Sequence, residues 1–93
     1  MIINNLVELE KIISELKDNN SNIGCITGSF DLLHDGHKEA IKFSKENCDK
    51  LIVLVNSDQS IKKYKGPTRP IESENKRIEN LNNLYNDCYF FFI

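Results

Sequence analysis

Ninety-three residues with a formal net charge of −2 are enough for one domain with a modest hydrophobic core. The slightly acidic balance argues against a nucleic-acid-binding protein, whose binding surface is usually basic and clustered. No apolar stretch approaches the roughly 18 residues that a membrane-spanning helix needs, and the N-terminus lacks the layout of a signal peptide. The three cysteines follow no framework spacing, which favours reduced thiols and a cytoplasmic location.

The first predicted element is an amphipathic helix that begins near Asn5 and ends at the polar cluster of residues 18–22. Apolar residues recur in it at three- and four-residue steps: Leu6, Leu9, Ile12, Ile13 and Leu16. A short buried strand is predicted for residues 23–27, and Cys25 within it is expected to pack in the core.

The stretch from Gly28 to His37, which reads GSFDLLHDGH, follows that strand and precedes a second helical segment. Phosphate binds in α/β proteins where a strand runs into a glycine-containing turn and a helix start, because the first backbone N–H groups of a helix lack partners. His34 and His37 flank Gly36 and can donate hydrogen bonds to a phosphoryl group as its charge develops. The same imidazoles could form half of a metal site, but no further ligands with suitable spacing accompany them.

The segment after the motif predicts a helix at residues 37–47 and a second strand at 51–55. In the helix, Ala40, Ile41 and Phe43 are expected to face inward. The strand is a continuous apolar and β-branched run, which is typical of strands buried on both faces of a parallel sheet.

The last third of the chain predicts one more helix and strand. A turn and a short helix occupy residues 56–64, and the proline-containing stretch after them must be loop. Ser73 is the expected N-cap of a helix that carries four inward apolar residues: Ile78, Leu81, Leu84 and Tyr85. Residues 88–93 form a third apolar strand, with Cys88 expected in the core.

Alternation of helices and strands predicts an α/β fold, a Rossmann-like three-layer α/β/α sandwich with a parallel sheet, built as a single domain over residues 1–93. Ligands of such sheets bind beyond the carboxyl ends of the strands. The segments that follow Thr27 and Val55 both fall at those ends. One cleft is therefore expected to contain both.

Four motifs in this chain resemble those of the cytidylyltransferase-like nucleotidyltransferase superfamily. They are G-x-F-D-x-x-H-x-G-H at 28–37, V-N-S-D at 55–58, K-G-x-x-R-P at 65–70 and E-x-x-R at 74–77. Their order is similar to that in the adenylyltransferase domain of the bacterial ADP-heptose synthases, and the similarity covers essentially the whole chain. One departure is T-G-S-F at 27–30, where the heptose enzymes more often read N-G-C-F and the coenzyme-A-pathway adenylyltransferases are closer.

The resemblance implies nucleotidyl transfer, in which a phosphate oxygen of one substrate attacks the α-phosphate of a nucleoside triphosphate and pyrophosphate departs. It implies His34, His37 and Lys65 as catalytic residues. The implied nucleotide-binding residues are Gly28, Ser29, Phe30, His34, Gly36 and His37. Mg²⁺ carried by the triphosphate is the expected cofactor, and no metal site made by the protein is expected.

A phosphorylated acceptor is the second implied substrate, and the residues implied to bind it lie mostly beside the cleft: Asp31, Lys62, Lys65, Arg69 and Arg77. Asp31 could instead brace its own loop, and Lys62 could belong to a solvated surface. Arg77 either anchors the basic loop, the segment around Lys65 and Arg69, or binds phosphate. Lys38 could approach the same phosphates or face water.

The expected function is transfer of a nucleotidyl group from a nucleoside triphosphate, with ATP favoured, to a phosphorylated sugar or polyol such as heptose 1-phosphate. A CTP-dependent glycerol-phosphate or ethanolamine-phosphate cytidylyltransferase is the alternative within the enzyme class. The alternative outside it is a non-catalytic nucleotide-binding or assembly module. Neither nucleic acid nor membrane is expected as a partner.

The resemblance also predicts an incomplete sheet, because relatives continue through at least two more strand–helix units. In the doubly wound order 3-2-1-4-5, this chain would supply strands 3-2-1 and leave the motif-bearing strand at an edge. An uncovered apolar edge strand tends to pair with another chain. A homo-oligomer or a complex with a complementing partner is therefore expected.

Overall fold

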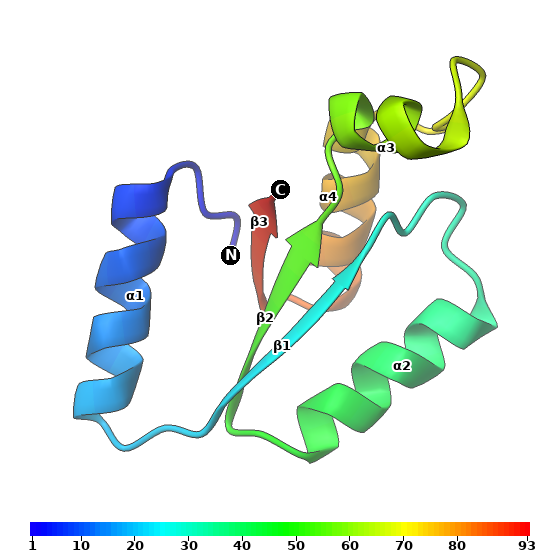
Figure 1. The fold of residues 1–93 in the computed structure, drawn as a ribbon. Coiled ribbons are helices and arrows are strands. Elements are labelled where there is room, and N and C mark those ends of the chain that lie inside the picture. Colours follow the sequence, from blue (N-terminus) through cyan, green and yellow to red (C-terminus); the bar gives the residue numbers. More distant parts are fainter.

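A computed structural model describes all 93 residues and confirms the predicted α/β class (Figure 1). Three parallel strands form one sheet, and four helices surround it. In chain order the elements are α1 (Leu6–Asp18), β1 (Ile23–Gly28), α2 (Asp35–Glu46), β2 (Lys50–Val55), α3 (Asp58–Lys65), α4 (Glu74–Leu84) and β3 (Tyr89–Phe92). None of the helices combines the length and apolarity needed to cross a lipid bilayer.

The sheet has the strand order β1-β2-β3, so β2 lies in the centre and the two remaining strands are edges. β1 pairs with β2 from Ile23 opposite Lys50 to Gly28 opposite Val55, and β3 pairs with the second half of β2. The expected 3-2-1 arrangement is confirmed. Parallel pairing brings the carboxyl ends of the strands to one edge of the sheet, where the loops after β1 and β2 emerge.

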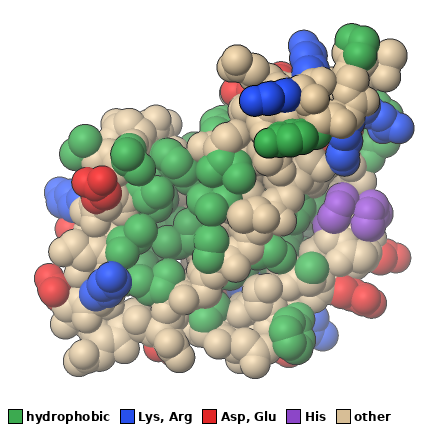
Figure 2. All heavy atoms as spheres, in the orientation of Figure 1, with side chains coloured by type: hydrophobic (Ala, Val, Ile, Leu, Met, Phe, Trp, Pro, Cys, Tyr) green, Lys and Arg blue, Asp and Glu red, His purple; other side chains and the backbone are tan.

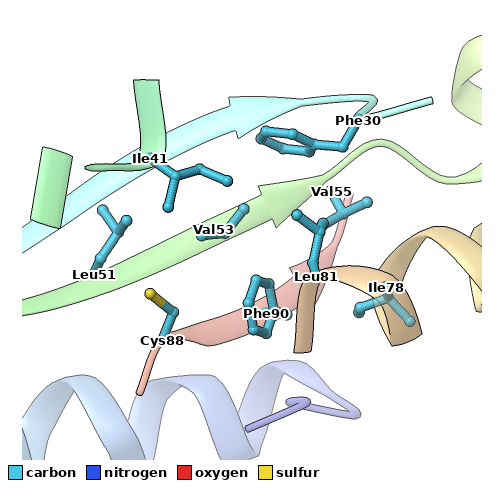
Figure 3. Close-up of a cluster of buried hydrophobic side chains, with 9 residues drawn as sticks. All are labelled: Phe30, Ile41, Leu51, Val53, Val55, Ile78, Leu81, Cys88 and Phe90. Carbon is cyan, nitrogen blue, oxygen red and sulfur yellow. The ribbon is translucent and has the colours of Figure 1, made fainter. Parts of the chain in front are cut away.

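The principal core lies between the sheet and the helices α2 and α4 (Figure 3). Ile41 of α2 and Leu81 of α4 are fully buried there against alternate residues of β2 and β3. A smaller cluster on the opposite face holds α1 through Ile12 and Leu16, which pack near Tyr89 and the other outward residues of β3. Two layers of helices thus enclose the sheet.

Three residues expected in the core are exposed instead. Cys25 is exposed because α1 packs mainly over β3 and leaves the outer part of β1 uncovered. Ala40 is exposed as well, and Phe43 keeps 68% of its surface in contact with solvent. Both lie on α2, which covers β1, and β1 has no neighbour on its outer side. Cys88, by contrast, is buried as predicted.

The helix α4 begins after Ser73, as predicted. The prediction that all four of its apolar residues face inward is wrong for Leu84. The Ser73 hydroxyl accepts a hydrogen bond from the backbone N–H of Lys76 and so caps the helix. Leu84 is 56% exposed because it lies in the last turn of the helix, beyond the edge of the core.

The two edges of the sheet differ in how they are covered. Along β3, the N-terminal segment forms an isolated parallel bridge between Ile2 and Phe90. The Ile3 N–H donates to the Phe90 carbonyl at 2.8 Å, and the Phe90 N–H donates to the Met1 carbonyl at 2.9 Å. No segment of the chain pairs with the outer side of β1.

Candidate functional site

Two histidines form the start of α2, and each uses its ring to cap that helix. His34 is the N-cap residue, and its Nδ1 accepts a hydrogen bond from the Gly36 N–H at 3.1 Å. The Nδ1 of His37 accepts one from the His34 N–H at 3.3 Å. This is the reciprocal capping arrangement usually made by Ser or Thr with Glu, here made by two imidazoles. It starts the helix at Asp35, two residues earlier than predicted.

The caps determine which ring nitrogen can donate to a ligand. In a neutral imidazole one nitrogen carries the proton and the other accepts, so an accepting Nδ1 leaves the proton on Nε2. The rings of His34 and His37 stack with centroids 3.7 Å apart and an interplanar angle of 21°. The two Nε2–H donors are therefore held side by side at the positive end of a helix, which favours an anion.

Burial is the main cause that lowers the pKa of His37 below its usual value of 6.5, and the charges of His34 and Lys65 lower it further. His37 is therefore neutral at pH 7. A neutral ring with Nδ1 accepting is the tautomer that can donate from Nε2. Lys65 thus acts on His37 through its charge. Figure 2 shows Lys and Arg side chains gathered next to the His patch.

The ring of Phe30 packs against the ring of His37. It is 4% exposed, and its ring meets that of His37 edge-on at 5.4 Å between centroids. A Cβ on Gly28 would lie 3.0 Å from the Phe30 ring, and a Cβ on Gly36 would lie 2.9 Å from the His34 ring. Both glycines are thus explained by room for the chain's own rings. Their expected contacts with a nucleotide stay a prediction.

Asp31 joins the motif loop, residues 29–34 between β1 and α2, to the basic loop. Its Oδ2 and Oδ1 accept hydrogen bonds from the backbone N–H groups of Ile71 and Glu72 at 2.8 and 2.9 Å. Glu72 also binds the loop that contains Asp31, because its side-chain Oε1 accepts a hydrogen bond from the Leu32 N–H at 3.1 Å. Burial alone would raise the pKa of Asp31, but these two hydrogen bonds and the charges of nearby arginines outweigh it and lower the pKa. The geometry is that of a brace between the two loops.

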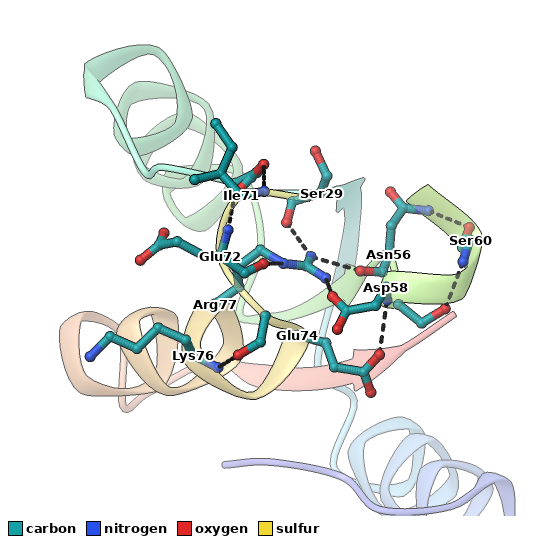
Figure 4. A network of polar contacts seen from close by, with 12 residues as sticks. Ser29, Asn56, Asp58, Ser60, Ile71, Glu72, Glu74, Lys76 and Arg77 are labelled. Carbon is teal, nitrogen blue, oxygen red and sulfur yellow. Dashed lines mark hydrogen bonds and ion pairs between the residues drawn. The ribbon is translucent and has the colours of Figure 1, made fainter. Parts of the chain in front are cut away.

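Arg77 has no exposed surface, so the expectation that it binds substrate does not hold in this structure. Its guanidinium donates to the carbonyls of Ser29 (2.6 Å), Asn56 (2.7 Å) and Glu72 (3.1 Å). It also pairs with Asp58 Oδ1 at 2.9 Å (Figure 4). The alternative role, anchoring the loops, is the one its contacts show.

The remaining basic residues are exposed. Lys62 and Lys65 lie in the last turn of α3. Arg69 follows in the loop, with its guanidinium 4.0 Å from Asp31. Gly66 ends the helix with a φ of 92°, a conformation that glycine adopts without strain. These cations reach the solvent at the same end of the sheet as the histidines.

Glu72 was not singled out from the sequence, and no contact was predicted for Asn56 or Glu74, which belong to the V-N-S-D and E-x-x-R motifs. Glu74 accepts the Asp58 N–H at 2.8 Å and so ties α4 to α3. Glu72 and Asn56 hold Asp31 and Arg77 as described. The spacing of the two histidines, at the N-cap and the third helical position, was the available signal for the capping arrangement.

The chain contains no group of three or more His, Cys, Asp or Glu side chains that could hold a metal ion. Mg²⁺ commonly binds through substrate phosphates with one or two carboxylates. Mg²⁺ carried by a triphosphate stays a prediction.

A comparison with protein families matches residues 25–92 to the cytidylyltransferase-like family. The chain belongs to this family. The match includes the motif loop, both following strands and the basic loop.

Relatives of this cytidylyltransferase-like chain include three proteins named bifunctional protein HldE. Those of Paramagnetospirillum magneticum, Hyphomonas neptunium and Caulobacter vibrioides are 40%, 47% and 39% identical to it over 74, 62 and 77 residues. These matches cover 80%, 67% and 83% of this chain but only 15%, 13% and 16% of the relatives. The chain thus spans about a seventh of their length.

A solved structure is similar as well. The lipopolysaccharide core biosynthesis protein from Thermoplasma volcanium GSS1 superposes with a TM-score of 0.67 and 33% sequence identity. The superposition covers 76% of this chain and 57% of that protein. The fold of this cytidylyltransferase-like chain is therefore shared with a protein of known structure.

Proposed function

We propose that this chain binds a nucleoside triphosphate at the His34–His37 pair and transfers its nucleotidyl group to a phosphorylated sugar or polyol. The observation that carries the proposal is the mutual capping of the two histidines, which leaves two Nε2–H donors side by side at a helix N-terminus. Membership of the cytidylyltransferase-like family and the similarity to the HldE proteins support the reaction class.

The reaction requires no covalent bond between the protein and either substrate. A phosphate oxygen of the acceptor forms a bond to the α-phosphorus, the bond to the bridging oxygen breaks, and pyrophosphate leaves with that oxygen and its electrons. The attacking phosphate is already ionised at neutral pH. The protein must bring two anions together and stabilise the charge that develops on the transferring group. Fixed donors that need no reorganisation suit this task.

The residues divide into three roles. His34 and His37 donate to the α- and β-phosphate oxygens, with the backbone N–H groups of Ser29 and Phe30 beside them. Lys65 and Arg69, with Lys62 nearby, neutralise the acceptor phosphate. Mg²⁺ supplies charge neutralisation on the triphosphate when bound.

The preferred substrates are ATP and a sugar phosphate such as heptose 1-phosphate, because the HldE proteins are the relatives at 39–47% identity. CTP with glycerol phosphate or ethanolamine phosphate is the second pair. The three free thiols fit a reducing, cytoplasmic setting.

A non-catalytic nucleotide-binding module is a second candidate function. His34 is exposed, and none of the cavities in the structure is lined by either histidine. An enzyme usually encloses its reacting groups. The open position of the pair is the observation that favours this second function.

Association through the free edge of β1 is also proposed. The strand reads I-G-C-I-T-G and contains no charged side chain, so nothing in it opposes pairing with another strand. A second copy or a complementing polypeptide would cover it and close the site from that side.

Pyrophosphate release measured with ATP and with CTP, against sugar phosphates, glycerol phosphate and ethanolamine phosphate, tests the proposal. We expect release with ATP and a sugar phosphate, lost in His37→Ala and retained in Lys11→Ala, a control on the far side of the sheet. Turnover that survives His37→Ala would refute the mechanism. No turnover, with thermal stabilisation of the protein by triphosphate, would establish the binding module.

A further inference from the structure

A trough between α2 and the C-terminal end of α4 lies beside the histidine pair without including it. One hollow of about 420 Å³ is lined by Lys38, Lys42, Lys45, Glu46 and Tyr85. A second hollow of about 340 Å³ shares Lys38 with it and continues past Asn80 and Leu84 of α4 toward the loops. Neither histidine lines either hollow. Their volumes are in the range of sites that bind small molecules.

The charge of this trough contrasts with that of the chain. Three lysines and one glutamate line the larger hollow, although the chain as a whole has a net charge of −2. Lys38, Lys42 and Lys45 are spaced by four and three residues, so they share one flank of α2 within about 10 Å. Like charges at this spacing repel and destabilise a helix. A bound anion would offset that repulsion.

Lys38 and Lys42 are available to bind such an anion. Neither Lys38 nor Lys42 has an ion-pair partner, whereas Lys45 is held by Asp87 at 2.8 Å. The hydrogen bond from Lys45 to Asp87 is the main cause that raises the pKa of Lys45. That pair joins the end of α2 to the turn before β3 and so fixes the far end of the trough.

Tyr85 forms an aromatic wall. It follows the last residue of α4, is partly buried, and has the Lys45 ammonium 5.5 Å from its ring centroid. An ammonium this close to an aromatic ring is attracted to its face. The contact with Lys45 therefore holds the Tyr85 ring in place in the absence of a ligand. Free cations next to a fixed aromatic surface are suited to a phosphate group attached to a ring.

We propose that this trough is a second anion site, which binds a small phosphate ester with a ring, such as a nucleoside monophosphate or a sugar phosphate. Lys38 and Lys42 hold the phosphate, and Tyr85 contacts the ring. The inference rests on the trough alone and stands whether or not the histidine pair catalyses transfer. Since Lys38 directly follows His37 on α2, a ligand here would lie beside the histidine site without occupying it.

Titration of the isotope-labelled protein with AMP and with ribose 5-phosphate, followed by amide chemical shifts, tests this site. We expect saturable shifts at Lys45 and Tyr85 and weaker binding as salt rises. Lys42→Gln and Lys38→Gln should each raise the Kd about fivefold or more, as expected for a lost charge-assisted contact. Lys11→Gln on α1 should leave it unchanged. If AMP binds more tightly than ribose 5-phosphate, the site is for a nucleotide. If the two bind equally, the site is for a sugar phosphate.

Two results would overturn the proposal. The first is shifts confined to Gly36 and His37, which would mean that the phosphate occupies only the histidine pair. The second is a Kd at Lys45 and Tyr85 that Lys42→Gln and Lys38→Gln both leave unchanged. Both lysines are exposed, so these variants are expected to fold.

Discussion

The guanidinium of Arg77 donates a 2.6 Å hydrogen bond to the carbonyl of Ser29, which lies 48 positions earlier in the chain. The same nitrogen donates to Asn56, so one buried side chain joins the loops after β1 and β2 to α4. The two loops also meet at their start, where the Asn56 N–H donates to the Gly28 carbonyl at 2.9 Å. Arg77 adds hydrogen bonds further along both loops and so helps to fix their relative position next to the histidine pair.

Arg77→Ala should lower the free energy of unfolding by roughly 3 kcal/mol, because it leaves Asp58 and three carbonyls without their donor. Urea denaturation measures the change. Lys76→Ala, at the exposed neighbouring position, should stay within about 0.5 kcal/mol of the natural chain. A small effect of Arg77→Ala would show that the loops are held by other contacts.

His34 can be tested as a cap and as a donor separately. His34→Ala removes both functions and should cost about 1 kcal/mol of stability, whereas His34→Ser keeps an N-cap and should cost less than about 0.5 kcal/mol. Both variants should lose stabilisation by a triphosphate in a thermal-shift measurement. If His34→Ser binds triphosphate as well as the natural chain, the imidazole is only structural.

The protonation of His37 should depend on Lys65. Because burial, His34 and Lys65 lower its pKa in that order, its NMR titration should have a midpoint below 6.5. Lys65→Ala should move the midpoint upward, and Lys11→Ala should not move it. Added pyrophosphate should also raise it, since an anion favours the charged ring. An unchanged midpoint in Lys65→Ala would place that ammonium out of reach.

The lowered pKa of His37 also predicts how stability changes with pH. The unfolded chain takes up the proton near pH 6.5, and the folded chain only at lower pH. The contribution of His37 is therefore complete above about pH 6.5 and is lost as the pH falls through the folded-state value. Urea midpoints at pH 7.5 and 5 should show this loss in the natural chain and a smaller one in His37→Gln.

Association through β1 should respond to a charge on that strand. Cys25→Lys places an ammonium at an exposed position of the edge and should shift the protein toward monomer in sedimentation velocity. Asn83→Lys, at an exposed position of α4, is the matched control. A natural chain that sediments as a monomer at every concentration would exclude self-association through this edge.

The order of elements was predictable because each has a clear local signal. The continuous apolar run of β2 and the Ser73 cap identify a central strand and a helix start from a few residues each. The exposure of Cys25 and Phe43 was not predictable in this way. Both are ordinary core residues by type, and only the position of β1 at the edge of the sheet leaves them in solvent.

The candidate site was predictable in its residue types but not in its contacts. The His-x-Gly-His spacing pointed to an anion site, and the structure brings the two rings together. The use of each Nδ1 as a cap depends on where α2 begins. The sequence predicts a start at residue 37, two residues after the observed start at Asp35. Arg77 could have faced either solvent or the loops. Its burial results from partners at Ser29 and Asn56, which are far away in sequence.

The pairing of the N-terminal segment with β3 has a consequence for the order in which the protein forms. The Ile2–Phe90 bridge joins residues 88 positions apart, and contacts of such long range form slowly because a large loop must close first. Met1 and Ile3 have no strand to dock on until β3, which contains Phe90, has joined the sheet. The segment before α1 is therefore among the last parts of the fold to reach its final place.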